Sequence, residues 1–188
     1  FLLGSLAPDA IHMRPATTRA DKRRTHLQNT SAADWPRPLR AWMARHVGDD
    51  PTFREFIRGY AAHLLADRLW ARTALQEFRR AAPAELDDGG LKALYYRELD
   101  QVDVNLFRTE PWRPCAWSML ATAPAMEAPG LLTANEIARW RTRTLAWFDD
   151  PAHDPGIVPA HLTEERVHVF VKEARDMVIR AGHDWAEW

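Results

Sequence analysis

The longest helical pattern in the chain begins at Asp50-Pro51 and constrains the fold more than any other stretch. Asp50 is a good N-cap, and proline is favoured at the first position of a helix. From there apolar side chains recur at spacings of three and four as far as Ala82, which predicts a central helix of up to ~30 residues, or two helices divided by a kink. The apolar face of this stretch comprises Phe53, Phe56, Ile57, Tyr60, Leu64, Trp70, Leu75 and Phe78.

Similar spacing elsewhere predicts that the rest of the chain is helical too. Further helical patterns cover residues 1–6, 21–27 and 35–47, separated by a loop over 29–34, and later ones start at Gly89-Gly90, Pro111, Thr133 and Thr163. Gly182 is expected to end the last of them. No stretch has a convincing strand alternation, and no internal repeat is found. We therefore predict an all-α fold, a compact multi-helix bundle around the central helix, with residues 1–188 forming a single domain.

Charge, hydropathy and cysteine content argue against a nucleic-acid-binding, a membrane-spanning and a disulfide-linked protein. The formal net charge of −1 provides no basic field, so we expect no nucleic-acid partner. No apolar run reaches the ~18 residues of a membrane-spanning helix. Cys115 is the single cysteine, which excludes an internal disulfide framework, and we expect it to be a small buried residue in a cytoplasmic protein. The sequence does not indicate an oligomeric state.

The first residues suggest that the natural protein has an upstream segment. The chain opens on Phe1-Leu2-Leu3-Gly4, which has the pattern of the end of an apolar helix and lacks an initiator methionine. We therefore expect this sequence to lack its natural N-terminal helix. Secretion, directed by a signal peptide in that upstream segment, stays open.

Two polar side chains interrupt the apolar face of the central helix. His63 and Asp67 are four residues apart, so on a helix they lie on one face, one turn from each other. An imidazole beside a carboxylate can bind a divalent metal. The two groups can equally form a packed, hydrogen-bonded pair without metal. Asp9, in a turn after a proline, and His26, after a basic stretch, offer the same ligand types. If the four converge, they match a catalytic zinc or binuclear site in a helical bundle.

Three blocks of the sequence carry a resemblance to a known family. Residues 1–12, 21–26 and 59–67 resemble, in this order, the bacterial zinc-dependent phospholipase C family in its short branch, within a wider group that includes P1 nuclease. The resemblance covers residues 1–70, and only a loose similarity at Tyr95 to Glu98 follows. It implies an all-α phospholipase C or P1 nuclease-like fold, one or two zinc ions, and a small phosphoester or phospholipid-like substrate.

The resemblance also implies roles for individual residues. Asp9, His26 and His63 resemble the three protein ligands of the first zinc, and Asp67 resembles the carboxylate that bridges to a second zinc. The family's second site also uses a group at or near the N-terminus, commonly a histidine in the first helix, which this sequence lacks. The family's third site cannot be matched here, because the later histidines do not follow its pattern: His153, His161 and His168.

The mechanism implied is attack of a metal-activated water on phosphorus. Asp9 would act as the general base if one of its oxygens stays near that water. His12, three residues after Asp9, is a possible further ligand or a hydrogen-bond donor to a carboxylate, and its alternative is a partly exposed loop histidine. Arg14, Lys22 or Arg68 could bind substrate phosphate, and the alternative for each is a solvated surface charge.

Two functions from different classes follow from these residues. The first is a zinc-dependent hydrolase of phosphoesters, a phospholipase C-like phosphodiesterase. The second is a non-catalytic metal-binding helical-bundle protein with a partial site. A purely packed histidine–aspartate pair without metal is a further option, and it predicts that Asp9, His26, His63 and Asp67 do not converge.

Overall fold

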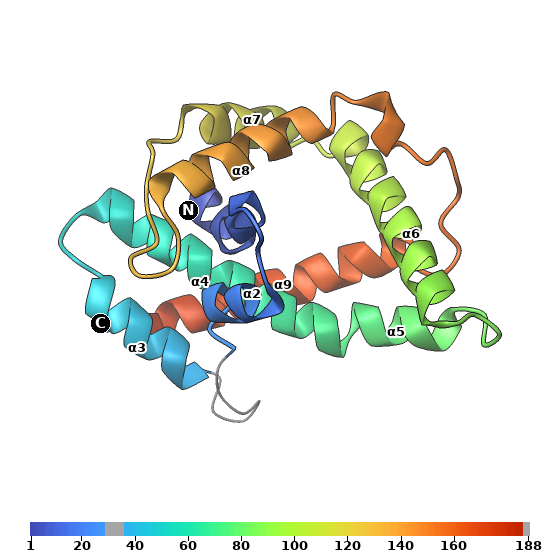
Figure 1. Cartoon of the computed structure of the whole chain (residues 1–188), viewed down its shortest axis with the longest axis horizontal. Helices are drawn as coiled ribbons and strands as arrows, with labels where there is room; N and C mark the ends of the chain where they lie inside the picture. The colour runs from blue at the N-terminus through green and yellow to red at the C-terminus, as the bar shows by residue number, and fades with distance from the viewer. Residues whose placement is uncertain (29–35, 186–188) are drawn as a thin grey trace. The chain divides into compact units, whose positions relative to one another are not determined.

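The structure, a computed structural model, describes residues 1–28 and 36–185 of the chain (Figure 1). All the regular elements in these residues are helices, and their single β interaction is an isolated antiparallel bridge between Ala128 and Leu132. The predicted all-α class is therefore confirmed for the described residues. The loop predicted over 29–34 lies outside them.

The long central pattern forms two helices instead of one. Helix α4 (Pro51–Arg72) begins as predicted, with the Asp50 carboxylate accepting a hydrogen bond from the Thr52 amide at 2.9 Å. At Thr73 the backbone leaves the helical region, with φ −117° and ψ −94°, and α5 (Ala74–Ala81) follows. The kink that the sequence left open is thus a complete break.

The chain divides into two compact units. Residues 1–64 and 115–145, with the chain from Gly182 onward, form the first unit, and residues 65–114 and 146–181 form the second. Helix α4 contributes to both. The single-domain organisation stays a prediction.

The first unit is organised by a close crossing of two helices. It contains α1 (Leu2–Leu6), the 3-10 helix η1 (Ala7–Met13), α2 (Arg19–Thr25), α3 (Pro36–His46), the first part of α4, and most of α7 (Arg113–Thr122) and α8 (Ala134–Trp147). A Cβ atom on Gly4 would lie 2.0 Å from the Phe56 carbonyl oxygen, and one on Gly59 would lie 2.0 Å from the Phe1 carbonyl oxygen. The backbones of α1 and α4 therefore touch, which holds η1 against α4.

The second unit has its own apolar core. It contains α5, α6 (Asp88–Thr109), the 3-10 helix η2 (Pro151–His153) and most of α9 (Glu164–Trp185). The buried residues of its core are Phe78, Val102, Leu162 and Val167. Trp70 packs against this core, with its indole N–H donating to the Tyr95 hydroxyl at 2.8 Å.

A buried carboxylate attaches the loop before α9 to α6. Glu98 is 2% exposed and accepts hydrogen bonds from the amides of Ala160, His161 and Leu162 and from the His161 ring, at 2.6–3.0 Å. Burial alone would raise the pKa of Glu98. These donors outweigh that effect and lower it. Glu98, the last residue of the stretch Tyr95 to Glu98, therefore has a structural role in the second unit.

Several local predictions can be compared with the structure. The predicted helix start at Thr133 is confirmed, and a capping box forms it: the Glu136 carboxylate accepts from the Thr133 amide, and the Thr133 hydroxyl accepts from the Glu136 amide. The helix end at Gly182 is wrong, since α9 continues to Trp185; an interior glycine costs a helix only about 1 kcal/mol. Burial of Cys115 is also wrong, because α7 buries only Leu120 and leaves the thiol exposed.

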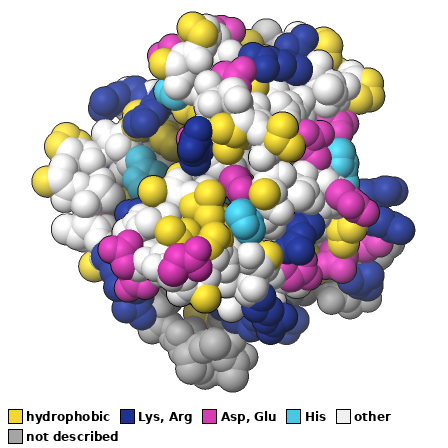
Figure 2. All heavy atoms as spheres, turned by 90° about the vertical axis from the view of Figure 1, so that its right-hand side faces the viewer, with side chains coloured by type: hydrophobic (Ala, Val, Ile, Leu, Met, Phe, Trp, Pro, Cys, Tyr) yellow, Lys and Arg dark blue, Asp and Glu magenta, His cyan; other side chains and the backbone are white. Residues whose placement is uncertain are grey.

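The described surface carries charges of both signs. On the face shown in Figure 2, basic and acidic side chains alternate with apolar ones, and the described atoms form no broad field of one sign. Among the described residues, no helix combines the length and apolarity that crossing a bilayer requires.

Candidate metal centre

His26 stands at the C-terminal end of α2, where two local motifs hold it. The helix begins with a capping box between Thr18 and Asp21 and ends at Thr25. The His26 Nδ1 atom lies 2.9 Å from the Lys22 carbonyl oxygen, one turn back. Leu27 then turns the chain away with φ 51°, in the left-handed region that residues other than glycine rarely adopt. The ring is 1% exposed.

His63 is oriented in the same way from another element. It projects from α4 toward α1, and its Nδ1 atom lies 2.8 Å from the Ser5 carbonyl oxygen. A carbonyl oxygen can only accept, so Nδ1 carries the proton and donates in both histidines. In the neutral ring, Nε2 then presents a lone pair. Metal-binding histidines are oriented by this kind of outer hydrogen bond.

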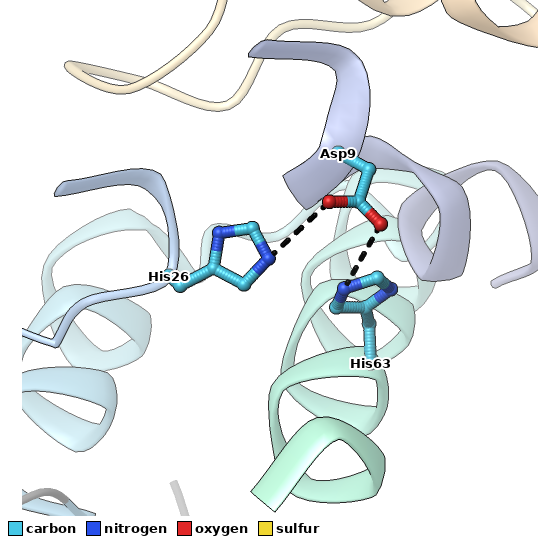
Figure 3. A group of neighbouring side chains, drawn as sticks. All are labelled: Asp9, His26 and His63. Carbon is cyan, nitrogen blue, oxygen red and sulfur yellow. Dashed lines mark ion pairs between the residues drawn. The ribbon is translucent and has the colours of Figure 1, made fainter. Parts of the chain in front are cut away.

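Asp9 places its carboxylate between the two Nε2 atoms (Figure 3). Its Oδ1 lies 3.5 Å from His26 Nε2, and its Oδ2 lies 3.8 Å from His63 Nε2. Together the three residues offer one ligand atom each, all within 4.8 Å of one another. Ligand bonds of about 2.0–2.2 Å at tetrahedral angles put neighbouring zinc ligands ~3.4 Å apart. The three side chains therefore have the composition and roughly the spacing of a zinc site.

The environment of Asp9 favours its ionised form. Burial alone would raise the pKa of this carboxyl, but His26 and His63, whenever their rings also carry a proton on Nε2, and the Lys22 ammonium hold it well below its usual range. A carboxylate that stays ionised is a good metal ligand. It is a weak proton acceptor, because an effective general base has a pKa near the working pH.

Tyr60 connects the helix that carries His63 to the turn that carries His26. Its side chain is fully buried, and its hydroxyl donates to the Thr25 carbonyl at 2.6 Å. Burial, with a further contribution from the charge of Asp9, raises the pKa of this phenol, so the hydroxyl remains a donor. Trp42 of α3 packs on the Tyr60 ring with centroids 4.9 Å apart.

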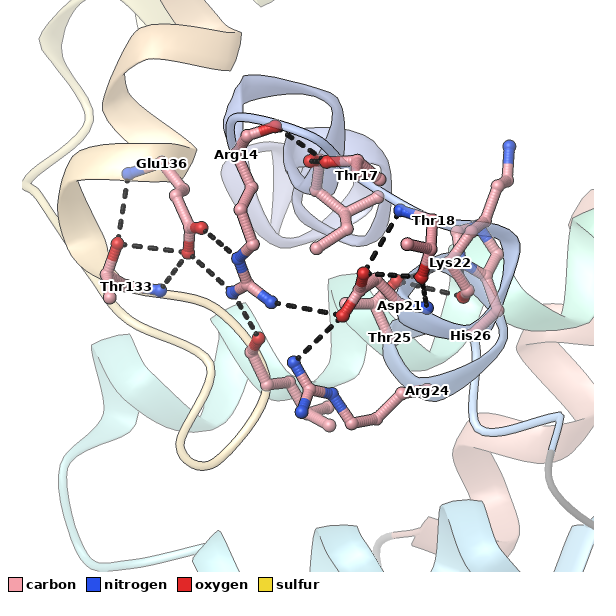
Figure 4. A network of polar contacts seen from close by, with 12 residues as sticks. Arg14, Thr17, Thr18, Asp21, Lys22, Arg24, Thr25, His26, Thr133 and Glu136 are labelled. Carbon is pink, nitrogen blue, oxygen red and sulfur yellow. Dashed lines mark hydrogen bonds and ion pairs between the residues drawn. The ribbon is translucent and has the colours of Figure 1, made fainter.

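A polar network ties η1, α2 and α8 together beside the site (Figure 4). The Arg14 guanidinium donates to both Glu136 oxygens, at 2.7 and 3.1 Å, and to the Leu131 carbonyl at 3.2 Å. Its remaining nitrogen lies 3.8 Å from Asp21. Arg14 was a candidate for binding substrate phosphate, and the structure instead engages it in holding the end of η1.

The structure brings together three of the five predicted site residues. Asp9, His26 and His63 form the single group of potential metal ligands found among the described residues. His12 lies outside that group: its side chain is 42% exposed, with Nε2 3.8 Å from Asp9 Oδ1, and its ring packs near Trp140. Asp67 follows His63 by one turn of α4 but belongs to the second unit, so its role as a bridging ligand stays a prediction.

Several contributors to the site were missed from the sequence. The carbonyls of Ser5 and Lys22 orient the imidazoles, and main-chain acceptors have no residue signature. Tyr60 was placed on the apolar face, but its hydroxyl contact could not be foreseen without the position of α2. Gly59 had a signal, because a glycine inside an apolar helical face often marks a close approach of another backbone.

The chain was also compared with known proteins. Neither the protein-family models nor the curated proteins nor the solved structures gave a match.

Proposed function

We propose that the chain is a zinc-dependent hydrolase of phosphoesters, related to the phospholipase C family that its first 70 residues resemble. The observation that supports this most is the orientation of two histidines by main-chain carbonyls, with both Nε2 atoms directed at one ionised carboxylate. Asp9, His26 and His63 would hold the ion. Catalytic zinc sites typically have three protein ligands and leave a further position for water or substrate.

The chemistry requires each of these residues to keep its position. A bound zinc ion would supply Lewis acidity, lowering the pKa of a water and polarising a phosphoryl oxygen. The chain's own contribution is to direct both Nε2 atoms at the site, to keep Asp9 ionised, and to fix the three side chains through Tyr60 and Ser5. Because the pKa of Asp9 is lowered, we assign it first as a ligand, and its role as general base stays a prediction.

The test combines metal analysis with hydrolysis. The protein, purified without chelator, is expected to contain stoichiometric zinc and to hydrolyse bis(p-nitrophenyl) phosphate. His63→Ala removes a ligand, so it should lower zinc affinity by more than the ~10–100-fold that loss of an outer hydrogen-bond partner costs, and abolish hydrolysis.

His153→Ala is the matched control. His153 also directs Nδ1 at a main-chain carbonyl, that of Trp147 at 2.7 Å, but it lies outside the ligand group and stacks on the Trp147 ring. It should keep zinc content and activity. Bound zinc without hydrolysis of any phosphoester would leave the non-catalytic metal-binding protein, and absence of stoichiometric metal would count against both functions.

A further inference from the structure

A lysine ammonium lies against the carboxylate of the candidate centre. Lys22 Nζ is 3.2 Å from Asp9 Oδ1, the same oxygen that faces His26 Nε2 at 3.5 Å. Lys22 therefore acts on the site twice, because its carbonyl also accepts from the His26 ring. In its present position the ammonium supplies positive charge to Asp9.

A divalent ion at this site would compete with that ammonium. An ion held by Asp9, His26 and His63 would sit within about 2.0–2.2 Å of its ligand atoms, beside the present position of Nζ. Two cations this close repel each other. The Lys22 side chain is 47% exposed, and its four-carbon stem is flexible, so the ammonium can move outward without leaving the rim of the site.

The other basic side chains near the site are held by contacts of their own, unlike the Lys22 ammonium. The Arg14 guanidinium is engaged by Glu136, Leu131 and Asp21. Figure 4 shows the Lys22 side chain directed away from that network. The Arg143 guanidinium lies 5.6 Å from the centre of the Trp140 ring, whose centroid is 5.8 Å from that of the His12 ring.

We propose that Lys22 balances the charge of Asp9 in the metal-free protein and, once the ion is bound, binds a non-bridging oxygen of an anionic phosphate substrate. This inference rests on the proposed metal site. It narrows the substrate class from phosphoesters in general to anionic phosphoesters. A displaced ammonium beside a metal ion attracts an oxyanion more strongly than a neutral ester.

The experiment measures two affinities with opposite expected changes. Chelator-treated protein is titrated with Co²⁺, whose visible absorption reports coordination, and the Co²⁺-loaded protein is then titrated with inorganic phosphate. Lys22→Met should tighten Co²⁺ binding about two- to fivefold, because a competing, partly exposed ion pair is lost. The same variant should weaken phosphate binding about tenfold, because a charge-assisted hydrogen bond is lost.

Two further variants serve as controls. Arg23→Met removes the same charge from the neighbouring position of α2. Among the described residues, the Arg23 side chain has one hydrogen bond, to the Gln28 carbonyl oxygen at 3.4 Å, so neither affinity should change. Lys22→Arg keeps the charge and should restore phosphate binding. A merely structural role for Lys22 predicts that Lys22→Met weakens both affinities, since misplaced ligands bind neither metal nor phosphate well.

The outcomes separate this inference from the proposed function. If wild-type protein binds Co²⁺ but Lys22→Met matches Arg23→Met in both affinities, or weakens both, the role of Lys22 is wrong while the metal site stands. If wild-type protein and His63→Ala bind Co²⁺ equally weakly, the metal site itself is wrong. Tighter Co²⁺ with weaker phosphate in Lys22→Met alone supports the inference.

Discussion

At the scale of single residues, a hydrogen bond from a histidine ring to a backbone carbonyl does not by itself mark a metal ligand. The other ring nitrogen must also face a partner such as a carboxylate. His26, His63 and His153 all direct Nδ1 at a backbone carbonyl. Only the first two also direct Nε2 at the Asp9 carboxylate. The convergence on one carboxylate therefore carries the argument for a metal, and the carbonyl contact fixes which nitrogen is presented.

The sequence identified the residue types of this site but not its geometry. Asp9, His26 and His63 could be selected because imidazole and carboxylate groups near an apolar helix are chemically conspicuous. Their convergence depends on the crossing of α1 with α4 and on the hydroxyl of Tyr60, which join segments more than 30 residues apart. Contacts of that range leave no periodic pattern in the sequence.

A buried carboxylate in the second unit gives a prediction with a defined pH dependence. Glu98→Gln should lower the free energy of unfolding by about 2–4 kcal/mol at pH 7, because an amide nitrogen would face donors that the carboxylate now accepts from. The folded pKa of Glu98 is lowered, so its contribution is full above the unfolded pKa of about 4.3 and is lost as the pH falls through the folded value. Denaturant unfolding at pH 7 and pH 3 measures the difference.

The control for Glu98 is an exposed carboxylate on the same unit. Glu77 is 53% exposed and lies 4.0 Å from Arg166. Glu77→Gln should change the free energy of unfolding by less than about 1 kcal/mol, as exposed ion pairs usually do. An effect of Glu98→Gln that is equally large at pH 7 and pH 3 would show that the carboxylate charge is not the cause.

At the scale of elements, the helices were largely predictable and their ends were less so. Apolar spacing found the helices of the described chain, and capping residues placed the starts of α4 and α8 correctly. The break at Thr73 was left open, because the apolar pattern continues across it. The end of α9 was misplaced, because Gly182 is a permissive residue whose backbone here stays helical. Local pattern fixes which residues are helical, while tertiary packing decides where a helix stops.

The crossing of α1 and α4 can be tested through Gly59. Gly59→Ala would place a methyl group 2.0 Å from the Phe1 carbonyl oxygen, a backbone atom, so α1 must move. Because Ser5 lies in α1 and Asp9 lies in η1, which follows α1 directly, we expect the variant to lose about 1–3 kcal/mol of stability and to bind zinc at least about tenfold more weakly. Thermal unfolding and zinc titration measure the two effects.

Gly182→Ala is the comparison for that variant. Apart from its chain neighbours and the backbone of its own helix, no atom of the described residues lies within 4 Å of the position that its Cβ would take, and the residue is inside α9. Replacing a helical glycine by alanine should stabilise the protein by up to about 1 kcal/mol and leave zinc affinity unchanged. If Gly59→Ala behaves like Gly182→Ala, then α1 does not position the site.

At the scale of the whole molecule, the candidate metal ligands and the apolar core with Glu98 belong to different compact units. The first unit contains the Asp9, His26 and His63 group, and the second contains the apolar core with Glu98. The amides of the two units should therefore respond differently to metal binding. A ligand that binds only the native first unit stabilises that unit by mass action, whereas the second unit gains only what α4 transmits.

Hydrogen exchange with and without zinc measures this division. At zinc concentrations of about 100 times Kd, binding contributes about 2.7 kcal/mol, so amides that exchange by opening of the site should slow up to about 100-fold. We expect slower exchange in residues 5–13, 22–27 and 57–64, with little change in 98–102 and 161–167.

Two variants serve as controls for this experiment. Glu98→Gln should affect the second unit alone, with faster exchange in 160–162 and unchanged zinc affinity. His63→Ala should remove the zinc effect altogether. Equal slowing of both units by zinc would mean that they unfold as one, because α4 would then couple the metal centre to the second core.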